Sequence, residues 1–240
     1  MMGLLKITAI KHLSRQYLRA ADQLNKLALE TEKSKLDENE QNNDFIYFNY
    51  KTYVISSIFN TIAFLEASIN EFYIQVAELD SPSTENEIVR NRFKDKWNNP
   101  NFERRSSMLI KYNTALELYD ANIFQYGDRL ISDIKYAIDL RNALTHYKTV
   151  YYDALNVDNN SNKTSSLEKE HNNRFELNPF KFYENSAFFP DRVLSYSCAN
   201  WSLKTSIQFT IEFYNRLQLP YPNSDLLELY DIDFVNNYEE

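Results

Sequence analysis

The stretch Ile55–Val76, "ISSIFNTIAFLEASINEFYIQV", decides the fold of this chain. Its apolar side chains recur at steps of three and four residues, which is the spacing of one face of an α-helix. The pattern extends both ways and predicts a long helix over about Asp44–Leu79, ended by "DSPSTEN" with Pro82. The residues expected to face the core are Ile55, Ile58, Phe59, Ile62, Leu65, Ile69, Phe72, Tyr73 and Val76.

Shorter amphipathic patterns on both sides predict further helices. The first covers about Ile10–Glu32 and is expected to face the core through Leu13, Tyr17, Ala20, Leu24 and Leu27. Two more are predicted over about Glu103–Tyr119 and Asp128–Lys148. A last main helix is expected to run to about Leu217, with Pro190 in its first turn.

The composition favours long helices. The chain of 240 residues has only 2 glycines but 18 tyrosines and 16 phenylalanines, and tight β-hairpins need glycine. The sequence therefore predicts a single all-α domain over 1–240, with its core at about 44–217. Residues 149–185 are expected to form a long polar insertion or loop, with a small hairpin at 149–157 as an alternative. The acidic tail at 218–240 is expected to pack in part, through Leu226, Leu227 and Tyr230.

Charge and motifs exclude several classes of function. A net charge of −8 argues against nonspecific coating of nucleic acid. The single cysteine, Cys198, allows no internal disulfide and is expected in the core. No zinc spacing, Walker A loop or Rossmann glycine pattern occurs, so neither a metal nor a cofactor is expected. The N-terminus lacks a signal-peptide pattern, and no apolar run approaches the roughly 20 residues of a membrane span, so a cytoplasmic protein without membrane contact is expected.

The stretch Asp139–Lys148, "DLRNALTHYK", carries the candidate chemistry. Asp139, Asn142 and His146 are three and four residues apart, so they share one face of a helix. Arg141 lies one step round the helix, and its long stem can reach over that face. The result is a polar cluster on a rigid element.

Three segments resemble the HEPN superfamily. The segment 141–147, "RNALTHY", is similar to the family's Arg-polar-x3-His signature. Phe64–Tyr73, "FLEASINEFY", resembles the family's early helix, and Cys198–Tyr214, "CANWSLKTSIQFTIEFY", resembles its closing helix. The resemblance spans about Asp44 to Leu217. It implies an up-and-down helical bundle, interrupted here by the polar insertion before its last main helix.

The resemblance also implies an activity and its residues. Many members are metal-independent ribonucleases that act as homodimers, often as toxins with a cognate antitoxin or as antiviral defence factors. The resemblance implies that Arg141 and His146 are the catalytic pair, since arginine binds phosphate oxygens and histidine transfers protons. The supporting residues are Asn142, Glu66, Tyr147 and Asp139. Tyr147 directly follows His146, so the modification known at a tyrosine two residues after the histidine is not carried over.

One dense positive run occurs elsewhere in the chain. It supplies the RNA-contact candidates Arg90, Arg92, Lys94, Arg104 and Arg105, together with Lys96. Phe93 and Trp97 lie within this run and could stack on bases. The alternative is an ordinary solvated helix face.

Two other functions stay open. A non-catalytic HEPN-like module would use Arg141 and His146 to bind a nucleotide or a partner protein. A purely structural helical protein would carry the motif by chance, and both side chains would then be surface contacts only.

Overall fold

The structure is a computed structural model that describes residues 12–37, 44–78, 87–147, 162–180 and 187–227. These residues form helices and loops without a strand, which confirms the all-α class for this part of the chain. The helices are α1 (Ser14–Asp37), α2 (Asp44–Glu78), α3 (Glu87–Trp97), α4 (Pro100–Arg105), α5 (Met108–Leu118), α6 (Arg129–Thr145), α7 (Asn162–Glu170), α8 (Tyr196–Arg216) and α9 (Ser224–Leu227).

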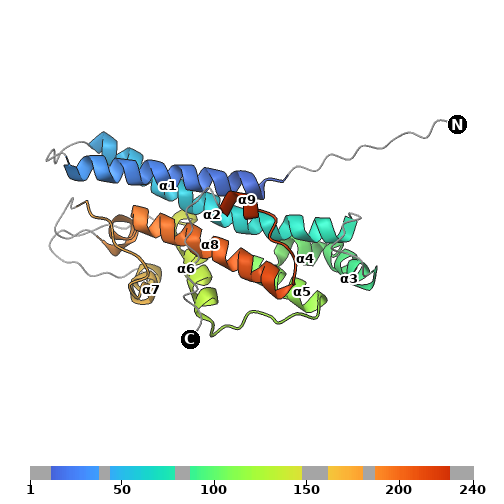
Figure 1. Cartoon of the computed structure of the whole chain (residues 1–240). Helices are drawn as coiled ribbons and strands as arrows, with labels where there is room; N and C mark the ends of the chain where they lie inside the picture. The colour runs from blue at the N-terminus through green and yellow to red at the C-terminus, as the bar shows by residue number, and fades with distance from the viewer. Residues whose placement is uncertain (1–11, 38–43, 79–86, 148–161, 181–186, 228–240) are drawn as a thin grey trace.

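The long helix α2 organises the bundle. It lies beside α1 along the molecule, α8 runs obliquely beneath them, and α6 stands steeply against α8 (Figure 1). Helices α3 to α5 gather at one end, and α7 lies at the other (Figure 1). The bounds of α2 confirm the predicted helix, although Phe59 is 36% exposed and does not face the core as expected.

Length and composition alone would also allow α2 to cross a bilayer. The segment Phe45–Ala77 is long and apolar enough, and half of its most apolar window is buried inside the bundle. The sequence expectation that no such run exists is therefore corrected. A core helix of a globular bundle meets the same criterion, because both environments demand a continuous apolar surface.

Two clusters of buried side chains follow each other along α2. The first core cluster contains the buried hydrophobic residues of α2 from Ile62 to Ala77 and centres on Phe72, whose ring lies 5.8 Å from Phe93 and 5.2 Å from Phe213. The second core cluster contains Tyr50, Val54 and Ile58 of α2 with residues of α6, α7 and α8. It includes Cys198, which is buried as expected.

The buried side of α1 is shifted by one residue from the prediction. Ala21 and Ala28 are fully buried, whereas Leu13 and Leu27 are 53% and 41% exposed. The Ser57 hydroxyl of α2 donates a hydrogen bond to the Ala21 carbonyl at 2.9 Å. This contact needs the two backbones close together, and only small side chains allow such an approach. The leucines therefore flank the contact.

The helix expected over Glu103–Tyr119 is divided into α4 and α5. The Ser107 hydroxyl accepts from the Ile110 amide at 3.4 Å and caps the start of α5. Asn99 caps α4 in the same way, accepting from the Asn101 amide at 3.0 Å. Serine and asparagine side chains compete with the helix for backbone donors, so they start a helix more readily than they continue one.

The last main helix also starts later than expected. Helix α8 begins at Tyr196, where the Ser195 hydroxyl accepts from the Cys198 amide at 2.9 Å. Residues Phe188–Arg192 form a separate π-helical turn that contains a cis Phe189–Pro190 bond. Pro190 therefore lies outside the helix that it was expected to start.

The loop expected at 149–185 needs correction over 162–180, since this part packs against the bundle. Arg174 donates from Nε to Asp133 Oδ1 of α6 at 2.7 Å, and its guanidinium lies 4.9 Å from the centre of the Tyr136 ring. Leu167 is buried in the second core cluster. The hairpin considered at 149–157 lies outside the described residues, as does Tyr230 in the tail, whereas Leu226 is buried as expected.

His171 is part of this packing. It is only 8% exposed, and its ring lies edge-on to Phe175 at 4.5 Å and near Phe188 at 5.6 Å. Its Nε2 has no hydrogen-bond partner in the described ranges. Burial lowers the pKa of His171 below its usual value, and the nearby Arg174 and Arg192 lower it further.

We expect acid to destabilise this end of the molecule through His171. Since its pKa is lower in the folded state, the stability that His171 contributes is present above about pH 6.5 and is lost as the pH falls below that value. Between about pH 7.5 and pH 5.5, the melting temperature of the His171→Phe variant should therefore fall by less than that of the wild type. The His12→Ala variant, which changes a 48% exposed side chain, serves as the control. An identical loss in the wild type and in His171→Phe would contradict this prediction.

Candidate functional site at the end of α6

The candidate site lies on the last two turns of α6. The helix starts after Asp128, whose backbone is extended at φ −67° and ψ 134°, and it ends at His146. The His146 amide donates to the Asn142 carbonyl at 3.0 Å and closes the last turn. Ile134 and Leu140 are fully buried and hold the helix on the core. A packed helix therefore positions the site.

Arg141 is half-buried on this helix. Its Nε is buried and has no hydrogen-bond partner among the residues that the structure describes. A guanidinium offers five N–H donors, and leaving a buried donor unpaired costs about 1–3 kcal/mol. Arg141 can therefore still donate a hydrogen bond to an anionic group beside α6.

His146 is exposed at the C-cap of α6. Tyr147 is 47% exposed, and its ring lies 6.1 Å from that of Phe189. Asp139 and Asn142 are half-buried on the face that leads to His146. Arg141 and His146 are five residues apart, which separates them by about 140° around a helix axis, so they can meet at one ligand only through the long arginine stem.

In the part of the chain that the structure describes, Glu66 interacts with Lys111 of α5 and not with the candidate residues of α6. It is exposed on α2 and lines a groove with Ala63, Ala67 and Asn70. Its carboxylate acts electrostatically on Lys111 of α5. Across the described residues, no hydrogen bond or ion pair joins Glu66 to Arg141 or His146. The structure thus places the other candidate residues on the end of α6, whereas Glu66 acts on Lys111.

Lys111 is a buried charged residue that the sequence analysis did not single out. Its Nζ donates to Asn70 Oδ1 at 2.8 Å and lies 5.5 Å from the centre of the Trp97 ring. Burial lowers the pKa of Lys111, and the carboxylates of Glu66 and Glu103 oppose that shift. Its position between apolar residues in "MLIKYN" was the signal that could have indicated its burial.

The basic run of α3 and α4 is partly occupied by contacts within the molecule. Arg92 pairs with Asp120 at 3.0 Å, and Arg90 is half-buried with contacts of its own. Lys94, Arg104 and Arg105 are exposed, and Arg104 lies 3.5 Å from Glu103. Four of the five RNA-contact candidates, Arg92 included, are therefore exposed to solvent.

The aromatic residues of this run cannot stack on bases as expected. Phe93 is fully buried, and its ring lies 5.0 Å from that of Tyr73. Trp97 stacks on Tyr73 at 5.1 Å, and Lys111 lies against its ring. The apolar period of α2 requires partners at this end of the helix, and these rings supply them.

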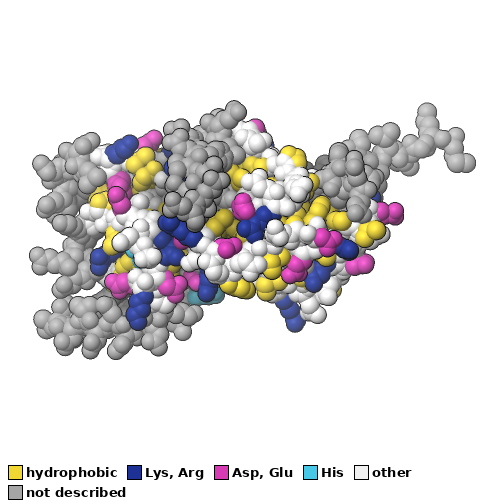
Figure 2. Space-filling model, turned by 60° about the horizontal axis from the view of Figure 1, so that its bottom comes forward, with side chains coloured by type: hydrophobic (Ala, Val, Ile, Leu, Met, Phe, Trp, Pro, Cys, Tyr) yellow, Lys and Arg dark blue, Asp and Glu magenta, His cyan; other side chains and the backbone are white. Residues whose placement is uncertain are grey.

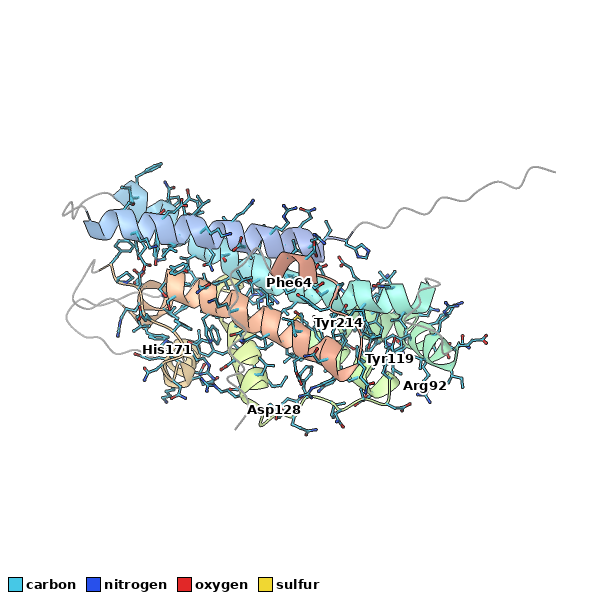
Figure 3. All side chains as sticks on the ribbon, viewed as in Figure 1. Phe64, Arg92, Tyr119, Asp128, His171 and Tyr214 are labelled. Atoms are coloured by element: carbon cyan, nitrogen blue, oxygen red, sulfur yellow. The ribbon has the colours of Figure 1, made fainter. Side chains whose placement is uncertain are left out.

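The basic run and the end of α6 lie at different places along the molecule. Helix α3 packs near Phe72, whereas α6 contributes Tyr136 and Leu140 to the cluster around Val54. Eighteen residues of α2 separate Val54 from Phe72, which corresponds to about 27 Å of helix. Figure 3 shows Arg92 and His171 at opposite ends of the bundle. On the face shown in Figure 2, basic and acidic side chains are interspersed.

No known family model, curated protein or solved structure matches this chain.

Proposed function

We propose that this chain is a HEPN-like, metal-independent endoribonuclease with Arg141 and His146 as its catalytic residues. The observation that carries the proposal is the end of α6, where the buried Nε of Arg141 lacks a partner among the described residues and the His146 side chain is exposed. A free guanidinium donor suits a phosphate, and an exposed imidazole suits proton transfer. The helical bundle around α2 is compatible with the up-and-down arrangement of that family.

The chemistry follows from RNA itself. The 2′-oxygen bonds to the adjacent phosphorus and gives up its proton to a base, while the bond from phosphorus to the 5′-oxygen breaks. The leaving 5′-oxygen takes a proton, so the products carry a 2′,3′-cyclic phosphate and a 5′-hydroxyl. Arg141 would hold the phosphate oxygens while negative charge grows on them. Asn142 would orient the imidazole or bind phosphate beside it.

The proposal includes a homodimer. The reaction needs both a base and an acid, and each α6 end supplies one histidine. Two copies related by a twofold axis would supply His146 twice. We place the enzyme in a toxin or antiviral defence role, with RNA as its substrate and an antitoxin or defence protein as its partner.

The test is cleavage of total cellular RNA by the purified chain in EDTA. We expect cleavage by the wild type, with cyclic-phosphate ends, and a loss of about 10²–10⁴-fold in His146→Ala, the range for removing a general acid or base. His12→Ala is the matched control, because it removes another exposed histidine, which lies two residues before α1. Cleavage that needs a divalent metal, or that persists in His146→Ala, would overturn the proposal.

The alternative is a non-catalytic module that binds a nucleotide or a protein. The net charge of −8 favours it, because RNA approaches an acidic protein against net repulsion. A wild type that cleaves no RNA but binds a nucleoside triphosphate, with affinity lost in Arg141→Ala, would support this alternative.

A further inference from the structure

One face of α2 exposes large aromatic side chains. Phe45 and Phe48 are 71% and 69% exposed, and Phe59 is 36% exposed. Together with the exposed Thr52, they repeat at steps of three, four and seven residues, so they form one stripe along the helix. We call this stripe and its continuation to Asn70 the outer face of α2. Exposed aromatic stripes of this kind mark interaction sites.

The part of the outer face that continues toward Asn70 contains a groove. A groove of about 340 Å³ lies there, with Ala63 and Ala67 contributing small side chains. Leu13 and Tyr17 of α1 form its other wall, and Glu66 and Asn70 are among its polar residues. The outer face therefore carries projecting rings at its first half and an open groove at its second half.

The rings and the groove are placed symmetrically about Ser56. Phe45 lies eleven residues before Ser56 and Ala67 eleven residues after it, while Phe48 and Ala63 lie eight before and seven after. A twofold axis at Ser56 would pair two α2 helices antiparallel. Each Phe45 and Phe48 would then enter the groove of the other copy, so that the contact is self-complementary.

We propose that a second copy of this chain docks on the outer face of α2, with its Phe45 and Phe48 seated over Ala63 and Ala67. Two copies with a net charge of −8 repel each other over most of their surfaces. The stripe from Phe45 to Phe59 carries no charged side chain, so the groove residues Glu66 and Glu71 of one copy would lie against an uncharged surface of the other. The neighbouring Lys51 is already paired with Asp191 at 3.0 Å.

The inference rests on the proposed function only for its catalytic consequence. Ile55 lies seven residues after Phe48 on the helix and packs against the second core cluster, as Ala143 and Leu144 of α6 also do. The end of α6 and this part of α2 therefore share one core cluster. The inference names the surface of α2 that the proposed homodimer would use.

The experiment measures the mass of the full chain by sedimentation equilibrium from about 1 µM to about 100 µM, a range that brackets dissociation constants of ordinary dimers. We expect a dimer for the wild type and a dissociation constant at least about a hundredfold higher for Phe45→Glu, because buried aromatic anchors dominate interface affinity. Ile88→Glu is the matched control, since it places the same charge at a 65% exposed apolar residue on α3.

A mixing test fixes the register. Ala67→Lys should also be monomeric on its own, because the lysine would meet Phe45 of the other copy. An equal mixture of Phe45→Glu and Ala67→Lys has one Glu–Lys contact and one native contact, so we expect dimers at least about tenfold tighter than in either variant alone. Circular dichroism verifies that both variants keep their helices.

The outcomes separate this inference from the proposed function. A wild type that is monomeric throughout, or a Phe45→Glu variant that dimerises like Ile88→Glu, overturns the contact. A monomer that instead binds phosphatidylglycerol vesicles through Phe45 also overturns it, in favour of a membrane surface. A wild type that forms the expected dimer but cleaves no RNA would support the contact and contradict the proposed ribonuclease activity.

Discussion

Replacing Arg141 by alanine is expected to lower RNA cleavage by about 10²–10³-fold, the effect of removing one preorganised donor to an oxyanion. The expected change in the free energy of unfolding is below about 1 kcal/mol, because the buried Nε gives up no hydrogen bond in the described part of the chain. Single-turnover cleavage of a defined RNA measures the first quantity, and urea unfolding measures the second.

Two further variants separate charge from geometry. Arg141→Lys keeps the positive charge but lacks the planar fork, so its cleavage should stay at least about tenfold below that of the wild type. Arg129→Ala is the matched control, since it removes a 77% exposed arginine from the first turn of the same helix. Equal losses in Arg141→Ala and Arg129→Ala would show that only net charge matters and would count against the site.

Replacing Phe93 by alanine is expected to lower the free energy of unfolding by about 3–5 kcal/mol, the range for a deleted core phenylalanine. Phe93 is fully buried, and its ring lies 5.8 Å from Phe72, 5.0 Å from Tyr73 and 5.3 Å from Tyr119. The surrounding rings belong to α2 and the end of α5, so removal leaves a cavity between elements that cannot easily collapse. Urea unfolding followed by circular dichroism measures the loss.

The control for this prediction lies on the same helix. Ile88 is 65% exposed, and Ile88→Ala should change the free energy of unfolding by less than about 0.5 kcal/mol. A Phe93→Ala variant that keeps its stability and loses only RNA affinity would contradict the packing and restore the base-stacking role that the sequence suggested.

The elements with a strong apolar period could be predicted from the sequence. The bounds of α2, Asp44–Glu78, agree with the predicted helix to within one residue, and α6, Arg129–Thr145, lies inside its predicted range. Both helices place most of their apolar stripe against a neighbour, so the period and the burial coincide. Helix bounds of this kind follow from local sequence.

Which face of a helix is buried proved harder to predict. In α1 the buried side includes Leu18, Ala21 and Ala28, whereas Leu13 and Leu27 are exposed. Hydrophobicity ranks leucine above alanine, but a close contact selects for size at Ala21, where the Ser57 hydroxyl reaches the backbone carbonyl. Phe59 was misplaced for a related reason, because a broad apolar stripe does not indicate which edge of it remains exposed.

Contacts between distant segments could not be read from local patterns. Arg174 lies in a polar stretch without apolar period, yet it pairs with Asp133 forty-one residues earlier and is only 13% exposed. His171 lies in the same polar stretch, and its burial could not be read from the local pattern either. The residues of the candidate site are visible in the sequence, since Asp139, Asn142 and His146 follow helical spacing. The partner of Glu66 is not, because it depends on how α5 packs against α2.

The division of the core along α2 has a practical consequence for spectroscopy. Trp97 stacks on Tyr73 in the first core cluster, while Trp201 lies 5.8 Å from Tyr136 and 5.3 Å from Phe175 of the second. The chain has 2 tryptophans, and Trp201 packs against the first core cluster as well as the second. Replacing Trp201 by phenylalanine therefore leaves an emission signal, from Trp97, that reports on the first core cluster alone. The loss of structure at that end of the bundle can then be followed by light, without attaching a dye.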